Sequence, residues 1–165
     1  MTIKNPVFDT DVWIGKGYDF SDGDFASLAL PLVVYCELVA GNISLKTKQN
    51  LDRLLIVKSK QKLLLLPTLA DWTKAANLVW RIRKAEENLQ VSGTTLQNDI
   101  IICRTVMRWN DEDYNPNRPE TRHIITNNVN DYRLITKYLN RQTDDIKNKK
   151  LSRLEIVSAQ DYFNV

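Results

Sequence analysis

Histidine, cysteine and glycine are scarce in this chain of 165 residues, and their scarcity excludes several kinds of site. The single histidine, His123, rules out a two-histidine metal site, and we interpret it as a polar residue at a strand edge. The two cysteines, Cys36 and Cys103, form no CxxC pair, which rules out a zinc ribbon, a thioredoxin-type centre and a disulfide scaffold. We expect both to be small buried hydrophobic residues. The sequence has five glycines and no GxGxxG or GxxxxGK, which argues against a glycine-rich phosphate cradle.

Long hydrophobic runs are missing as well. The chain begins MTIKNPVFDTDVW, which lacks the apolar core of a signal peptide, and no stretch reaches the ~18 apolar residues of a membrane span. We therefore expect a cytoplasmic protein with no membrane partner. Hydrophobic residues make up 43% of the chain and charged residues 26%, which is typical of a globular protein. The length suits a single domain over residues 1–165.

The net charge of +3 is mild, but the basic residues are unevenly distributed. Residues 46–62 hold six basic side chains against one acid, and residues 133–153 hold seven against two. Each stretch alone is typical of a solvated face. Together they are compatible with binding a polyanion.

Hydrophobic periodicity predicts strands that alternate with helices. Strand-like segments cover residues 7–13, 28–34, 63–66, 123–126 and 154–157. Helical patterns cover residues 35–41, 45–57, 69–89, 96–109 and 131–139, with Thr68 as an N-cap and a polar loop at 110–122. This alternation favours an α/β sandwich with a mainly parallel sheet, where ligands collect beyond the carboxyl ends of the strands.

Four carboxylates stand out at the ends of these segments. Asp9 and Asp11 lie near the end of the first predicted strand, where side chains two apart point the same way. Glu37 lies between apolar residues, and Asp99 precedes a run of three isoleucines. A buried carboxylate must be paired, cap a helix or bind a cation, because a bare buried charge is costly. A helix terminus or a salt bridge would explain each acid alone, whereas several together favour a shared site.

A cluster of oxygen ligands selects hard cations such as Mg²⁺ or Mn²⁺. These ions polarise phosphate groups and activate water, and basic surfaces would hold a phosphate backbone. The residues by themselves therefore point to metal-dependent phosphodiester chemistry.

Four segments resemble, in order, the motifs of PIN-domain nucleases. They are VFDTDVW at residues 7–13, ELVAG at 37–41, LQNDIII at 96–102 and ITNNVNDY at 125–132. The order, the spacing and the block PTLADWTKAA at residues 67–76 are similar to VapC-type toxins of bacterial toxin–antitoxin pairs. The resemblance covers about residues 6–160.

The resemblance implies a PIN-like three-layer α/β/α sandwich with a mainly parallel central sheet. It implies Mg²⁺- or Mn²⁺-dependent endonucleolytic cleavage of RNA, with Asp9, Glu37 and Asp99 as catalytic metal ligands. Thr10 matches the hydroxyl residue that helps to hold the site water. Toxin members pair with an antitoxin whose C-terminal segment covers the site, and they commonly form homodimers.

The fourth motif departs from the common family pattern. The family often has an acid two residues after the threonine, and here Asn128 follows Thr126 at that spacing. A neutral amide oxygen ligates more weakly than a carboxylate. The sequence also resembles a variant in which the asparagine is followed by an acid and an aromatic residue, which Asp131 and Tyr132 match. Either Asn128 or Asp131 would then serve the second metal position.

Two further residues are predicted to support the site. Asp11 replaces a small polar residue of the family motif, and Arg104 either pairs with a site acid or contacts phosphate, with the structural pairing favoured. A second hypothesis is a catalytically weak PIN-fold module that binds RNA or protein. A third is a receiver-like or phosphatase domain, since Asp9 and Asp11 form a DxD pair, but it leaves Glu37 and Asp99 unexplained.

Overall fold

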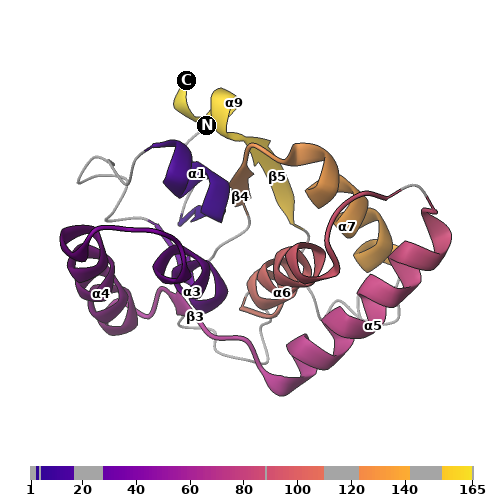
Figure 1. Ribbon diagram of the computed structural model, residues 1–165, viewed down its shortest axis with the longest axis horizontal. Helices are drawn as coiled ribbons and strands as arrows, with labels where there is room; N and C mark the ends of the chain where they lie inside the picture. The colour runs from indigo at the N-terminus through magenta and orange to yellow at the C-terminus, as the bar shows by residue number, and fades with distance from the viewer. Residues whose placement is uncertain are drawn as a thin grey trace.

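Helices alternate with short strands throughout the described part of the chain (Figure 1). The computed structural model describes residues 3, 5–16, 28–87, 89–109, 123–141 and 154–164. The elements in order are β1 (Val7–Phe8), α1 (Thr10–Gly15), β2 (Leu30–Pro31), α3 (Leu32–Ala40), α4 (Leu45–Lys60), β3 (Leu64–Leu65), α5 (Leu69–Ala85), α6 (Gly93–Trp109), β4 (His123–Thr126), α7 (Val129–Arg141), β5 (Glu155–Ser158) and α9 (Ala159–Phe163). The predicted loop at 110–122 and most of the basic stretch at 133–153 lie outside the described residues.

Every pairing among the described strands is parallel, as the sequence predicted. β4 lies between β1 and β5 in one sheet, and β2 pairs with β3 in another. A single parallel bridge between Val7 and Ala29 joins the two, which places the strands in the order β3, β2, β1, β4, β5. After β1 the chain forms β2 on one side of that strand, and it later adds β4 on the opposite side of β1. This reversal between β1 and β4 is where open α/β sheets place their ligands.

The helices form two groups around these strands (Figure 1). α1 packs against α3, and α4 lies beyond α3. α6 lies centrally, with α5 along one side of it and α7 against both α6 and β5. None of the described helices has the length and apolar character needed to cross a membrane.

The first predicted strand is shorter than the sequence pattern indicated. β1 ends at Phe8, and Asp9 is the N-cap of α1, where its Oδ1 accepts the backbone N–H of Thr10 at 2.8 Å. Asp11 therefore lies in the first turn of a helix, and the prediction that Asp9 and Asp11 share one strand face is wrong. The physical reason is the strong preference of aspartate for the N-cap, which overrides the β-branched and aromatic character of the segment.

The second apolar segment also changes from strand to helix partway. β2 ends at Pro31, whose φ of −67° and missing N–H suit the residue before a helix, and α3 starts at Leu32. The N-cap prediction at Thr68 is confirmed, because Thr68 and Asp71 form a reciprocal capping box. α6 begins at Gly93, three residues before the predicted start at 96.

The core lies around α6 and the strands. The isoleucines at 100–102 and Cys103 are 0% exposed, together with both residues of β1. Cys36, by contrast, is exposed on α3, so the prediction that both cysteines are buried is wrong for Cys36. Val34 and Leu38 occupy the inward face of α3 at a spacing of four, which turns the residue midway between them outward.

A stability prediction follows from the end of α4. Lys62 has a positive φ of 57°, a region that glycine adopts without strain. We expect Lys62→Gly to raise the free energy of unfolding by about 0.5–1 kcal/mol, measured by urea denaturation. The matched control is Arg53→Gly at an exposed position inside α4, which is expected to lower it by about 1 kcal/mol. Equal destabilisation by both changes would contradict this assignment of strain.

Candidate functional site

Asp9 and Thr126 join the ends of β1 and β4 at the point where the strand order reverses. Thr126 lies at the end of β4 and is 0% exposed, and its Oγ1 donates to Asp9 Oδ2 at 2.9 Å. The same hydroxyl oxygen accepts the backbone N–H of Asn128 at 2.9 Å. Because both strands are parallel, this contact lies at their carboxyl edge, where the sequence predicted a site.

Glu37 reaches the same region from α3 and is held by two donors. Thr10 Oγ1 donates to Glu37 Oε2 at 2.5 Å, and Asn98 Nδ2 donates to Glu37 Oε1 at 2.6 Å. Thr10 also donates its backbone N–H to Asp9, so one residue orients two of the predicted acids. The hydroxyl proton of Thr10 is therefore directed at Glu37, whereas the resemblance implied that it holds a water.

Asp99 is buried among negative charges. Its side chain belongs to the second turn of α6 and the residue is 6% exposed. Burial raises the pKa of Asp99 to about 8, and the charges of four other acids add to the shift; they are Asp9, Glu37, Asp131 and Asp11. The helix N-terminus does not account for Asp99, because the dipole effect falls off within the first turn. Acids from three distant parts of the sequence thus act on one carboxyl group.

Asp9 is also harder to ionise than an ordinary aspartate. Burial and the charge of Asp11 raise the pKa of Asp9 to about 6, although hydrogen bonds from the Thr10 N–H and the Thr126 hydroxyl favour the ionised form. Desolvation therefore outweighs the hydrogen bonds.

Asn128, Asp131 and Asp11 surround these acids in supporting positions. Asn128 Nδ2 donates to Asp131 Oδ2 at 2.6 Å, so the asparagine side chain orients the nearby acid in the first turn of α7. Asp11 Oδ2 accepts the backbone N–H of Asn127 at 3.0 Å, and its Oδ1 is buried without a hydrogen-bond partner among the described residues. Burial raises the pKa of Asp11 as well.

Arg104 lies beside Asp71 of α5. Its Nε lies 3.8 Å from Asp71 Oδ1, and Arg108 Nε lies 3.0 Å from Asp71 Oδ2. Asp71 is 1% exposed and belongs to the capping box of α5. The ion pair that the structure shows for Arg104 is therefore structural, but its partner Asp71 is not one of the predicted site acids.

Two residues at the site were not predicted, namely Asn98 and Tyr132. Asn98 orients Glu37 directly. The hydroxyl of Tyr132 is fully buried and lies close enough to Asp9 to lower its pKa, yet no described group completes a hydrogen bond of good geometry with it. Each residue is the sequence neighbour of a predicted acid and lies inside one of the four motifs, and these are the signals that could have drawn attention to them.

The donor chemistry of the cluster suits a hard divalent cation. Asp9, Glu37 and Asp99 offer carboxylate oxygens, and burial followed by the charges of neighbouring acids raises the pKa of Asp9 and Asp99. Ionisation of these groups is therefore costly without a counter-charge, which a divalent cation would supply. In the described part of the chain, however, no three acidic, cysteine or histidine side chains lie close enough together to hold a metal ion. The acids therefore lie close enough to influence one another's pKa, but not close enough to form a complete set of metal ligands among the described residues.

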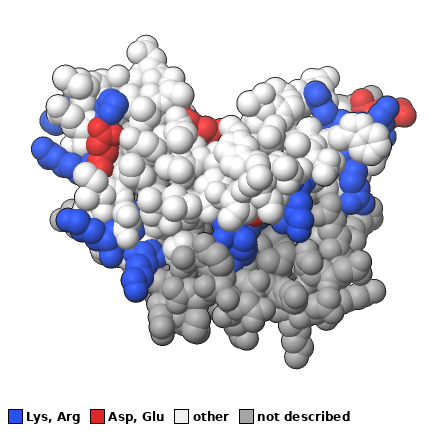
Figure 2. Space-filling model, turned by 90° about the horizontal axis from the view of Figure 1, so that it is seen from below, with Lys and Arg blue, Asp and Glu red and all other residues white. Residues whose placement is uncertain are grey.

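The molecular surface is hollowed between the part that carries α3 and α4 and the part that carries α5 and α6 (Figure 2). Acidic atoms are exposed on the wall of this hollow, and Lys and Arg side chains line the outer edge on the α4 side. The exposed basic residues of the predicted stretch are Lys46, Arg53, Lys60 and Lys62. Lys58 is 0% exposed, so it does not belong to that solvated face.

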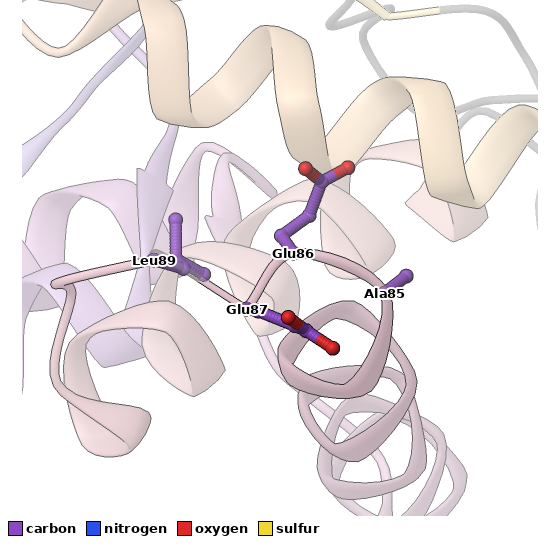
Figure 3. Close-up of a pocket in the computed structure, with 4 residues that line it drawn as sticks. All are labelled: Ala85, Glu86, Glu87 and Leu89. Carbon is purple, nitrogen blue, oxygen red and sulfur yellow. The ribbon is translucent and has the colours of Figure 1, made fainter.

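A separate pocket of about 510 Å³ lies at the end of α5 and is lined by Ala85, Glu86, Glu87 and Leu89 (Figure 3). Glu86 points toward α7, where it accepts a hydrogen bond from the Tyr138 hydroxyl at 2.9 Å and lies 3.6 Å from Lys137 Nζ. Glu87 points the other way and is exposed. Its carboxylate provides a reference charge outside the site.

A scan against protein-family models and a search of curated proteins gave no match to this chain. The resemblance to PIN-domain nucleases therefore rests on the four sequence motifs, their order and their spacing.

The raised pKa values predict how stability depends on pH without divalent metal. The folded state holds the Asp99 proton up to about pH 8, whereas the ordinary pKa is 3.8, so the free energy of unfolding falls as pH rises between these values and levels off above them. Asp9 contributes in the same direction up to about pH 6. We expect Asp99→Asn to be more stable than the parent by several kcal/mol at pH 8.5, and similar at pH 4, in EDTA.

Chemical denaturation across this pH range measures the difference. Glu87→Gln is the matched control, since it removes one carboxylate at an exposed position and should leave the pH profile unchanged. Parallel pH profiles for Asp99→Asn and the parent would contradict the burial and repulsion described for Asp99.

Proposed function

We propose that this protein is a Mg²⁺- or Mn²⁺-dependent endoribonuclease of the PIN class. The observation that supports the proposal best is the group of buried, mutually repelling carboxylates at the edge of β1 and β4, with Asp99 under the influence of four other acids. A fold that gathers carboxyl groups whose ionisation is costly without a counter-charge is suited to binding a cation.

Asp9, Glu37 and Asp99 are the residues that would hold the ion. When bound, a divalent ion supplies Lewis-acid chemistry, because it lowers the pKa of water and offsets the charge of a phosphate group. Asp131 supplies further negative charge to the site and is oriented by Asn128.

The chain's own contribution is to fix the carboxylates in place. Thr126 and the backbone of Thr10 occupy both oxygens of Asp9, and Thr10 and Asn98 occupy both oxygens of Glu37. Polar partners of this kind orient metal-binding carboxylates, and their loss typically lowers metal affinity or activity. The ordered contacts therefore favour a site that is organised before substrate arrives.

The biological role that we propose is that of a toxin in a toxin–antitoxin pair, with RNA as substrate and a cognate antitoxin as protein partner. The order and spacing of the four motifs and the block at residues 67–76 support this role. The parallel strands and flanking helices are compatible with the proposed PIN-like sandwich. A homodimer in the cytoplasm belongs to the same proposal.

The central test is removal of one proposed ligand. Asp9→Asn is expected to lower RNA cleavage by roughly 100-fold or more, since loss of a ligand should exceed the 10- to 100-fold effect of losing a supporting contact. Cleavage of a labelled RNA panel is measured in Mg²⁺, Mn²⁺ and EDTA, with Glu87→Gln as the control that retains activity. Equal activity in EDTA and Mg²⁺ would overturn the proposed mechanism.

A second test concerns the hydrogen bond that Thr126 donates to Asp9. Thr126→Val removes the hydroxyl that donates to Asp9 while keeping nearly the same volume, and we expect about 10- to 100-fold weaker Mn²⁺ binding. Thr126→Ser retains the hydroxyl and should restore most of the affinity. Titration of Mn²⁺ by calorimetry measures both variants, and unchanged affinity in Thr126→Val would contradict the role assigned to this hydroxyl.

A second candidate function is a PIN-fold module that binds RNA or protein without turnover. It is favoured by the open arrangement of the acids, since no three of them in the described residues form a ligand shell, and by the replacement of an acid with Asn128. Stoichiometric Mn²⁺ binding without cleavage of any RNA in the panel would favour this alternative.

A further inference from the structure

A mainly apolar pocket of about 310 Å³ lies beside Glu37. Its walls come from α3, from the start of α5 and from α6, and they include Leu32, Val33, Pro67 and Trp72. Glu37 and Asn98 line it as well. The volume is at the lower end of the ~300–1,000 Å³ range of small-ligand pockets, so it suits one ring system rather than a duplex.

The pocket is continuous with the carboxylate cluster. Glu37 lines the pocket and is also one of the clustered carboxylates. Asn98 lines the pocket as well, and its Nδ2 donates to Glu37 Oε1 at 2.6 Å. The Asn98 amide nitrogen is directed at Glu37, so its carbonyl oxygen is the atom that can accept from a ligand. Anything bound in the pocket would therefore lie immediately next to the proposed cleavage site.

Trp72 gives the pocket an aromatic wall on a rigid support. The residue is 41% exposed and lies in the first turn of α5, directly after the Thr68–Asp71 capping box. Asp71 is in turn held by Arg108 Nε at 3.0 Å. An exposed indole on a fixed turn is the kind of surface on which nucleic-acid bases stack.

We propose that this pocket binds one unpaired base of the RNA substrate beside the scissile phosphate, with the base stacked on Trp72 and a base N–H donating to Asn98 Oδ1. The inference rests on the proposed function and adds to it a subsite for single-stranded RNA. A base is favoured over an apolar protein side chain because the pocket combines an aromatic wall with an amide acceptor and opens onto the phosphodiester site.

Cys36 provides a direct probe of the pocket. It lines the pocket and is exposed, whereas Cys103 is 0% exposed and its burial raises the pKa of its thiol well above the ordinary value. A thiol reagent should therefore modify Cys36 selectively. The rate of its alkylation reports occupancy without depending on cleavage.

The experiment measures this rate in the full chain with Ca²⁺ in place of Mg²⁺. The probes are RNA hexamers of adenosine, cytidine or uridine and a matched abasic ribose-phosphate hexamer. We expect at least one base-containing hexamer to slow alkylation several-fold, and the abasic hexamer to have no effect. Trp72→Ala should weaken binding of that hexamer by roughly 5- to 100-fold, whereas Trp80→Ala, at a 64% exposed position of the same helix outside the pocket, should not.

Three further outcomes distinguish failure of the pocket proposal from failure of the proposed function. Metal-dependent cleavage together with equal protection by the abasic hexamer, or with no effect of Trp72→Ala, would overturn the base subsite and leave the nuclease intact. If no hexamer protects Cys36 although the protein cleaves RNA, the subsite is likewise overturned and a protein side chain becomes its candidate occupant. Base-dependent protection without any cleavage would support the subsite and count against the nuclease.

Prior alkylation of Cys36 should reduce hexamer affinity, which tests the same pocket without a Trp72 variant.

Discussion

The hydrogen bond from Thr126 to Asp9 connects two strand ends and also orients a carboxylate of the proposed site. Asp9 begins α1 as its N-cap and at the same time lies at the end of β1, so its side chain is placed by the backbone of both elements. Thr126 fixes the second carboxylate oxygen from the end of β4. The two central strands and the first helix therefore meet through one buried carboxylate, and the other acids of the site are arranged around it.

The same arrangement places acidic groups that repel one another when they are ionised close together. Burial and neighbouring charge raise the pKa of Asp99 and of Asp9, so ionisation of these groups opposes folding when nothing offsets it. Hydrogen bonds to Asp9 and Glu37 hold the side chains in this unfavourable proximity. Functional sites commonly hold charged groups in positions that lower the stability of the fold. This supports the metal-dependent function proposed for the cluster.

Local patterns predicted much of the fold, because they depend on neighbouring residues. The periodicity of α4 and α5, the apolar run of β4 and the Thr68 cap were all visible in the sequence. The pattern failed where two local preferences competed. Asp9 could extend a strand or cap a helix, and Pro31 could interrupt a strand or precede a helix, and the structure has the second outcome in both places.

The site was predicted less completely, since its contacts span long distances along the chain. Asn98 reaches Glu37 across 61 positions, and Thr126 reaches Asp9 across 117. No periodicity encodes such pairs. The predicted acids were recognisable because carboxylates are unusual beside apolar runs, whereas Asn98 and Tyr132 are ordinary in a helix until their partners are known.

The position of α6 has a consequence for how this chain can vary. Asn98 and Asp99 contribute to the acidic site from its first half, while Arg104 and Arg108, one turn apart in its second half, hold Asp71. Adding or deleting one residue between these groups would rotate one half against the other by about 100°. Related chains should therefore tolerate no change of length between positions 98 and 108.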